Sequence, residues 1–397
     1  MHGPSDKPTW PDHVVDHLKR AVIDADDHLD AMRARFRRRF RAQQPRHIAA
    51  YRGFGDASGI EFSGRVLAER PQGGPKEEAP WWDNLLDTYR RFESDEVPNL
   101  PLRLHVGAAV HDTTTDHEGY YRADLPNSAP VAEGLWTHIM ATLADGSLPT
   151  PQPILQVPMG PGIGVISDID DTVLQSGIVH WKTAAQLTFL HNARTRKPLD
   201  GVARLYHALQ AGPPGAGEVP IFYVSSSPWN LYDLLEDFME LNGIPAGPMF
   251  LRDLGTDPGK FLKTAGHGHK LDRARLLIDR FPERRWILLG DSGQADAELY
   301  AQAADDYGDR IAAIYIRDVD PDGDTERDRQ VDGHIERVGP TGVPMMRVRN
   351  SDAIAAHAHE MGWIAADWLN EVASEVKRDE NRPELGEAAL EGSVPTP

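Results

Sequence analysis

The sequence predicts an α/β fold for its larger, C-terminal part, in which helices cover both faces of a parallel sheet. Short apolar segments alternate with amphipathic segments from Ile163 onward, as they do in such sheets. Carboxylates and hydroxyls directly follow several of the apolar segments, where parallel strands present ligand sites. The preceding part has short alternating segments separated by polar turns, which predicts a small β-sandwich.

The 397-residue chain is long enough for two domains with separate cores. Prolines and glycines punctuate the stretch between Pro149 and Pro161, and we place the boundary between the two domains there. The predicted parts are an amphipathic helical segment (1–46), a β-rich, sandwich-like domain (47–158), an α/β domain (159–376) and a disordered acidic tail (377–397).

Composition restricts the chemistry and the partners. A formal net charge of −19 would repel a polyanion, so we expect no binding to nucleic acid. The absence of cysteine excludes disulfides, thiolate nucleophiles and Cys-ligated zinc. The sequence shows neither a secretory signal nor an apolar run long enough to cross a bilayer, so we expect a cytoplasmic protein, or one in peripheral contact with a membrane.

A long amphipathic helix is predicted between Asp12 and Gln44, because apolar residues recur there every three or four positions. Its second half gathers six arginines around Phe36 and Phe40, a pattern typical of helices that lie on anionic membranes. The alternative, which we favour, is that the apolar stripe packs on a neighbouring domain and the arginines are solvated.

The remaining elements follow from periodicity and turn residues. In the β-rich part we predict strands at 60–67, 102–110 and 119–125 and a helix at 82–92. In the α/β part we predict strands at 163–167, 221–224, 249–251, 286–289 and 311–316, and helices ending near 210 and spanning 231–241, 271–281, 295–304 and 351–376.

Two carboxylates, Asp168 and Asp170, follow the first strand of the α/β part. Residues at i and i+2 share a side while the chain remains extended. One carboxylate can attack a phosphorus atom while the other handles the proton of the leaving group. Thr172 follows the pair and is a candidate contact for the substrate.

Hydroxyl and ammonium groups follow at later element ends. Ser225 and Ser226 close the second strand and offer hydroxyls and N–H groups to a phosphate at a helix start; Ser226 and Ser227 can equally cap that helix. Lys270 precedes the next helix and supplies a positive charge for phosphate oxygens. Arg194 and Arg196, in the loop between the first two strands, are candidate phosphate or headgroup contacts, or solvated charges.

Asp291 ends a further strand, and Asp296 follows five residues later. Carboxylates of this kind suit a hard cation held by oxygen and water, so Mg²⁺ is the expected cofactor. Asp296 can also be no more than a helix cap.

Two weaker patterns are rejected. Asp318, Asp320 and Asp322 resemble the start of an EF-hand loop, but Arg329 stands where that loop requires glutamate, which leaves a surface acidic loop. His269, with its neighbour His267, is expected to be solvated in a polar loop.

The motifs DIDDT, a strand ending in serine, a lysine and GDxxxxD, in this order, resemble the haloacid dehalogenase (HAD-like) superfamily of phosphotransferases. SDIDDT, FYVSSSPWNLYDLL, FLRD and ILLGDSGQADAELY, between Gly164 and Val319, are further similar to the catalytic domain of the actin-patch phosphatidate phosphatase family. The resemblance implies a HAD-like Rossmannoid sheet in the α/β domain.

The resemblance also implies a role for each site residue. Asp168 would form an aspartyl-phosphate, and Asp170 would protonate the leaving oxygen and then activate water. Mg²⁺ would lie between Asp168, the backbone carbonyl of Asp170 and Asp291. Ser225 and Lys270 would hold the phosphoryl oxygens, and Asp296 would orient Lys270 or a metal-bound water.

The function predicted on this basis is Mg²⁺-dependent hydrolysis of a phosphomonoester, with phosphatidate, converted to diacylglycerol, as the substrate that the resemblance favours. A phosphatase of a soluble phosphomonoester is one alternative. The other is an adaptor that binds a membrane or a protein partner and carries a vestigial phosphatase domain.

Overall fold

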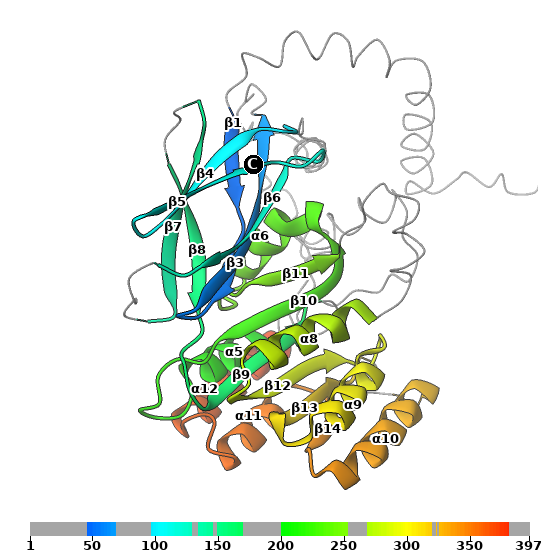
Figure 1. The fold of residues 1–397 in the computed structure, drawn as a ribbon. Helices are drawn as coiled ribbons and strands as arrows, with labels where there is room; N and C mark the ends of the chain where they lie inside the picture. The colour runs from blue at the N-terminus through cyan, green and yellow to red at the C-terminus, as the bar shows by residue number, and fades with distance from the viewer. Residues whose placement is uncertain are drawn as a thin grey trace, which may run out of the picture.

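The computed structural model describes residues 46–68, 97–128, 134–145, 149–169, 200–252, 268–319, 323 and 325–380. These residues form a β domain and an α/β domain that lie against each other (Figure 1). The helices predicted at 12–44 and 82–92 lie outside the described residues. The same holds for four predicted site residues, Asp170, Thr172, Arg194 and Arg196.

The β domain contains eight strands that are joined by hydrogen bonds into one sheet. The strand order is β1-β3-β2-β8-β7-β4-β5, with β6 paired to β3, and only the β2–β8 pair is parallel. The strands are β1 (Arg46–Ala50), β2 (Gly53–Gly55), β3 (Gly59–Ala68), β4 (Pro101–Val106), β5 (Ala109–Thr114), β6 (Tyr120–Pro126), β7 (Trp136–Leu143) and β8 (Thr150–Gln156).

This sheet packs like a sandwich although its hydrogen bonds are continuous. Phe62 of β3 and Tyr121 of β6 share one buried core with Leu104 of β4 and Ile139 of β7. The two halves of the sheet therefore face each other, and the short strand β2 joins them. The predicted strand 102–110 is wrong, because the chain turns at Gly107, whose φ of 57° suits a turn, and returns as β5.

The α/β domain has the parallel sheet and the two helical layers that the sequence predicts. Its sheet has the order β11-β10-β9-β12-β13-β14, and all five neighbouring pairs are parallel. The strands are β9 (Gly162–Asp168), β10 (Ile221–Pro228), β11 (Met249–Arg252), β12 (Arg284–Asp291), β13 (Ile311–Arg317) and β14 (Met345–Val348).

Helices cover both faces of this sheet (Figure 1). One layer holds α5 (Val202–Ala211), α6 (Tyr232–Leu241), α11 (Ser351–Glu360) and α12 (Asp367–Glu380), and the other holds α8 (Gly268–Arg280), α9 (Asp296–Tyr307) and α10 (Glu326–Val338). Short 3-10 turns are η2 (Trp229–Leu231), η3 (Gly308–Arg310) and η4 (Gly339–Thr341). The strand order reverses between β9 and β12, and sheets of this kind bind ligands beyond the carboxyl ends of the strands at such a point.

The C-terminal part corrects two predictions. The helix predicted at 351–376 is two helices, because α11 ends before Gly362, which has a φ of 74°. The predicted disordered tail begins too early, since α12 continues to Glu380. The buried Asp379 carboxylate accepts a hydrogen bond from the Gly201 N–H at 3.0 Å.

Helix α10 and strand β14 were not predicted, and their contacts change the interpretation of Asp318, which was expected in a surface acidic loop. Asp318 is buried and forms an ion pair with Arg347 of β14 at 2.8 Å. The same arginine reaches Asp328, which forms a capping box with Thr325 at the start of α10. Asp318 is therefore a structural residue of the fold and not part of a surface loop.

Aromatic side chains join the two domains. Tyr51, just after β1, stacks on Tyr232 with ring centroids 4.0 Å apart and on Trp229 at 5.5 Å. The Arg52 N–H donates a hydrogen bond to the Tyr232 hydroxyl at 2.8 Å, and the Arg52 guanidinium pairs with Glu236. These contacts attach the β domain to the segment that follows β10.

A second set of rings lies on the other side of β10. Phe54 of β2 packs edge-on against Phe222 and Phe250, each with a centroid distance of 5.5 Å. Arg280 at the end of α8 donates a hydrogen bond to the carbonyl of Gly59 at 3.0 Å. Each buried ring removes a large apolar area from water, and through Tyr51 and Phe54 the β domain contributes to the cores on both faces of the α/β sheet.

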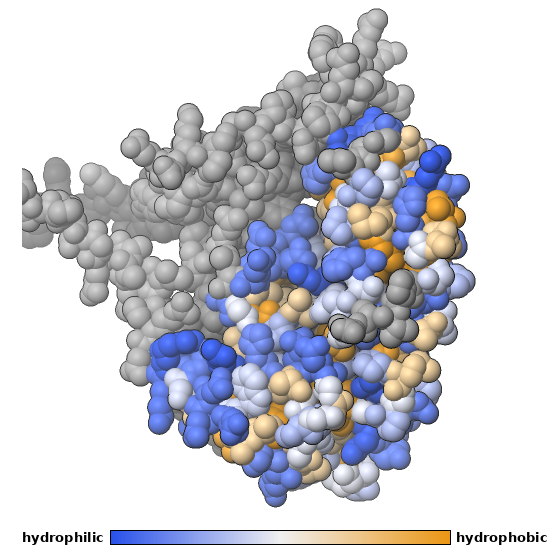
Figure 2. Space-filling model, turned by 90° about the vertical axis from the view of Figure 1, so that its left-hand side faces the viewer, coloured by the Kyte–Doolittle hydropathy of each residue, from blue (hydrophilic) through white to orange (hydrophobic). Residues whose placement is uncertain are grey.

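The described surface is mixed in character. On the face in Figure 2, hydrophilic and apolar residues are interspersed. The exposed large apolar side chains, Val110, Met159 and Met361, belong to different parts of the chain. Within the described residues, no helix combines the length and apolarity needed to cross a bilayer.

We expect Tyr51→Ala to lower the free energy of unfolding by about 3 kcal/mol, because the substitution empties a ring site between the domains. Tyr51→Phe keeps the ring and is the control; we expect it to cost less than about 1 kcal/mol. Urea unfolding followed by tryptophan fluorescence measures both. If Tyr51→Ala were as stable as Tyr51→Phe, the stacked rings would not hold the domains together.

Candidate active site

Three strand ends meet at the point where the strand order reverses. Asp168 ends β9 and pairs in register with Val224 of β10, so Ser225 follows beside it. On the other side, Leu289 of β12 pairs with Ser167, which places Asp291 near the same edge. The predicted meeting of Asp168, Ser225 and Asp291 is thus present in the structure.

Lys270 lies at the centre of this group. Its ammonium nitrogen is 2.7 Å from a carboxylate oxygen of Asp168 and 2.7 Å from one of Asp296, and it donates a further hydrogen bond to Gln294. Only 1% of the lysine side chain is exposed, so the two carboxylates offset the cost of burying its charge. Lys270 is the third residue of α8 and does not precede the helix as predicted.

Asp296 positions the lysine. Its Oδ1 accepts a hydrogen bond from Lys270, and its Oδ2 accepts one from the Asp291 N–H at 3.3 Å. Ala295 occupies the N-cap of α9, without a side-chain cap, so Asp296 is not the helix cap that was the simpler interpretation. One carboxylate oxygen of Asp296 thus holds Lys270, and the other holds the backbone of Asp291.

The turn after β12 fixes Asp291. Its Oδ1 accepts hydrogen bonds from the N–H groups of Gly293 at 2.6 Å and Gln294 at 2.8 Å. The preceding Gly290 lets Asp296 approach, because a Cβ at this position would stand 2.7 Å from the Cβ of Asp296. The glycine in the GDSG sequence was a signal for this close approach that the sequence analysis did not use.

The carboxylates fit a hard divalent cation. Oxygens of Asp168, Asp291 and Asp296 lie within 4.8 Å of one another, and all three residues are buried. Both oxygens of Asp296 already accept hydrogen bonds, which leaves Asp168 and Asp291 as the better ligands. An all-oxygen donor set of this kind suits Mg²⁺.

A chain of hydroxyls supports the backbone of Asp168 from the opposite face of the sheet. The Ser167 hydroxyl donates a hydrogen bond to the Asp168 carbonyl at 2.8 Å. Since that hydroxyl has one proton, Tyr206 of α5 must donate its own proton to Ser167 across 2.6 Å. Burial raises the pKa of Tyr206, so the phenol keeps this proton at neutral pH.

The serines at the end of β10 have distinct places. Ser225 is fully buried, and its hydroxyl accepts a hydrogen bond from the Ser227 N–H at 2.9 Å. Ser226 is partly exposed. Neither η2 nor α6 has a side-chain cap, so the capping role considered for Ser226 and Ser227 is absent.

His269, expected to be solvated, lies in the first turn of α8 and is partly buried. Burial, together with the nearby Arg273, lowers the pKa of His269 to about 4. Its imidazole is therefore neutral at physiological pH and adds no charge beside Lys270.

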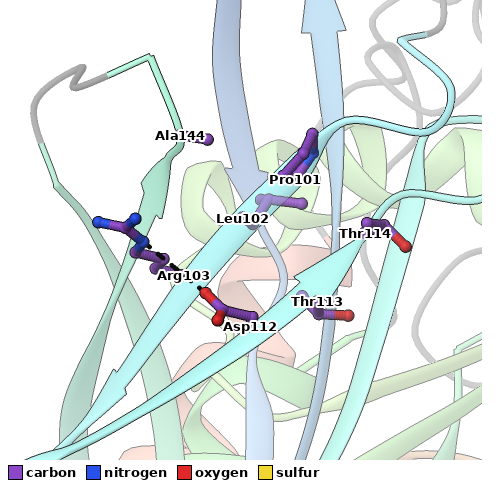
Figure 3. A pocket seen from close by; sticks show the side chains of 7 residues that line it. All are labelled: Pro101, Leu102, Arg103, Asp112, Thr113, Thr114 and Ala144. Carbon is purple, nitrogen blue, oxygen red and sulfur yellow. Dashed lines mark ion pairs between the residues drawn. The ribbon is translucent and has the colours of Figure 1, made fainter.

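A shallow depression of about 360 Å³ lies elsewhere, over β4 and β5 (Figure 3). The ion pair between Arg103 and Asp112 spans it at 3.7 Å, and both side chains are well exposed. Exposed pairs of this kind contribute little energy. Asp168, Ser225 and Asp291 do not line this depression, so we assign it no part in the site.

Residues 163–318, which include every described residue of the site, match the family described as "Phosphatidate phosphatase APP1, catalytic domain". The segment is thus similar to this family of catalytic domains. Phosphatidate phosphatase APP1 of Saccharomyces cerevisiae is 34% identical over 157 residues, which cover 39% of this chain and 26% of the yeast protein. An uncharacterized protein of Schizosaccharomyces pombe is 28% identical over 159 residues, 40% of this chain and 25% of that protein.

The chain thus spans about a quarter of the length of these relatives. Among solved structures, a carbohydrate acetylesterase from Xanthomonas citri gives a TM-score of 0.28 at 10% identity, covering 78% of this chain and 69% of its own. A second carbohydrate esterase gives 0.20 at 10% identity, covering 86% and 99%. At these TM-scores neither likeness bears on fold or function.

We expect Gly290→Ala to destabilise the protein by about 1–3 kcal/mol, because the added methyl group would displace Asp296 and with it Lys270. Gly333→Ala is the matched control: it lies on the exposed side of α10 with open space around it, and there alanine should stabilise the helix by about 1 kcal/mol. Urea unfolding measures both. Equal stability of Gly290→Ala and the wild type would contradict the tight packing inferred here.

Proposed function

We propose that the protein is a Mg²⁺-dependent phosphatase that hydrolyses a phosphomonoester through an aspartyl-phosphate on Asp168. The observation that carries the proposal is the buried group of Asp168, Asp291, Asp296 and Lys270 at one sheet edge. Three carboxylates around a single ammonium leave an excess of negative charge that a divalent cation would balance. The APP1 family match supports a phosphate-directed chemistry.

The proposed reaction has two steps. A carboxylate oxygen of Asp168 attacks phosphorus, the bond from phosphorus to the leaving oxygen breaks, and Asp170 gives that oxygen a proton. Asp170, which lies outside the described residues, then takes a proton from a water that attacks the phosphorus, which releases inorganic phosphate and restores Asp168.

The described residues prepare Asp168 for this attack. The hydroxyl chain from Tyr206 through Ser167 holds its backbone, so its carboxylate starts from a fixed place. The Lys270 ammonium would exchange its contact with Asp168 for one with a phosphoryl oxygen, and its ion pair with Asp296 would remain. Mg²⁺, held by Asp168 and Asp291, would supply charge neutralisation for the phosphoryl oxygens.

Phosphatidate is the substrate we propose, on the ground that the yeast relative is named a phosphatidate phosphatase. If the arginine-rich segment around Phe36 and Phe40 bound an anionic membrane, which is the less favoured of its two interpretations, it would bring the enzyme to such a substrate. An assay of phosphatidate in mixed micelles beside soluble phosphomonoesters tests the proposal, and we expect phosphate to be released from phosphatidate. Release of phosphate from soluble esters alone would favour the small-molecule alternative.

We expect Asp168→Asn to lower kcat by more than about 10⁴-fold, because the amide cannot act as the nucleophile. Full phosphatase activity of Asp168→Asn would refute the mechanism. A wild type without phosphatase activity, together with an Asp168→Asn variant that keeps every other activity of the protein, would favour the adaptor role.

Asp291→Asn should weaken Mg²⁺ binding by about tenfold or more, measured by calorimetry on the full chain. Asp309→Asn removes the same charge from an exposed residue at the opposite end of β13 and is the control.

A further inference from the structure

Arg317 is the last residue of β13 and pairs in register with Asp291. Residues paired across parallel strands point to the same face, so Arg317 shares the face of Asp291 at the edge that forms the site. Its backbone carbonyl accepts a hydrogen bond from the Ser292 N–H at 2.8 Å, which ties the ends of β12 and β13 together. Arg317 is thus held next to the candidate metal ligand.

Tyr315, two residues earlier in β13, packs into the core on the α5 side of the sheet, so Arg317 points to that same side, opposite Lys270. It acts electrostatically on the Tyr206 hydroxyl, which also feels the charge of Asp168. Tyr206 in turn is bonded to Ser167, directly before Asp168. Lys270 approaches Asp168 from α8, in the other helical layer. Two cationic side chains therefore lie on opposite faces of the sheet near its carboxyl edge, Lys270 at β9 and Arg317 at β13.

Among the described residues, no oxygen accepts a hydrogen bond from the Arg317 guanidinium, and no carboxylate lies within 4.0 Å of it. Asp318, its chain neighbour, pairs with Arg347, and the influence of Asp200 on Arg317 acts over a longer range. Burial lowers the pKa of Arg317 to about 10, while part of the side chain stays open to solvent. A largely buried arginine is ordinarily paired with an anion.

We propose that Arg317 is a second anion-binding residue of this site, which holds an oxygen of the phosphoryl group of the substrate from the face opposite Lys270. The inference rests on the proposed phosphatase function and adds a residue to it. A guanidinium can give two parallel hydrogen bonds to phosphate, so the ligand would supply the acceptors that Arg317 lacks among the described residues. Lys270 already holds two carboxylates and would neutralise a phosphate dianion only in part.

The experiment measures binding of inorganic phosphate to the full chain with saturating Mg²⁺, by calorimetry. We expect Arg317→Gln to weaken phosphate binding by about 10–100-fold, because a charged hydrogen-bond donor is lost. Arg317→Lys keeps the charge but not the planar pair of donors, and it should give a smaller loss. Arg285→Gln removes the same charge from an exposed residue at the amino end of β12 and should leave the affinity unchanged.

A purely structural role would give a different result. If Arg317 only braced Tyr206, Arg317→Gln would lower thermal stability and kcat while phosphate affinity stayed at the wild-type value, and the proposal would be overturned. Should Arg317→Gln fail to fold, Arg317→Lys decides. Unchanged phosphate affinity in that variant would overturn the proposal that Arg317 gives paired hydrogen bonds to phosphate.

Failure of the phosphatase proposal is distinguishable from failure of this one. A wild-type protein that hydrolyses no phosphomonoester, yet binds phosphate through Arg317, would refute the phosphatase and support the anion site. A wild-type enzyme that turns over, with phosphate affinity indifferent to Arg317, would refute the anion site alone.

Discussion

The ion pairs of Lys270 with Asp168 and Asp296 are the interaction on which the site depends. An ammonium that is 1% exposed would be strongly unfavourable without partners, and each carboxylate would be equally unfavourable without the ammonium. The three groups come from β9, α8 and the start of α9. Because each buried charge requires its oppositely charged partner, the ion pairs fix these three elements relative to one another. Breaking such a group by removing one partner costs about 3–5 kcal/mol.

The β domain takes part in this organisation through β10. Its rings pack on Trp229 and Tyr232, which follow Ser225 within a few residues, and on Phe222, which lies within β10 itself. The strand that presents Ser225 is therefore held from both sides by a domain that contributes no described residue to the site. Rigid support of this kind is what a site needs when its groups must stay within tenths of an ångström.

The sequence predicted the strand ends well and the supporting contacts poorly. Asp168, Ser225 and Asp291 were found because an apolar run followed by a polar residue is a local pattern. The roles of Tyr206 and Arg317 depend on which face of the sheet their elements cover, and no local pattern contains that information. The hairpin at Gly107 was missed because an apolar run on both sides of a glycine resembles one strand.

Charge sets an order for ligand binding at this site. With its carboxylates ionised, the group of Asp168, Asp291, Asp296 and Lys270 has a formal net charge of −2, and Arg317 reduces this only to −1. A phosphate dianion approaching that group alone would meet net repulsion in a poorly solvated place, where Coulomb energies are large. A divalent cation held by Asp168 and Asp291 would neutralise the group of four and, with Arg317 counted, would bring the net charge to +1. Phosphate should therefore bind tightly only after the cation, with Lys270 and Arg317 directing it from the two faces of the sheet.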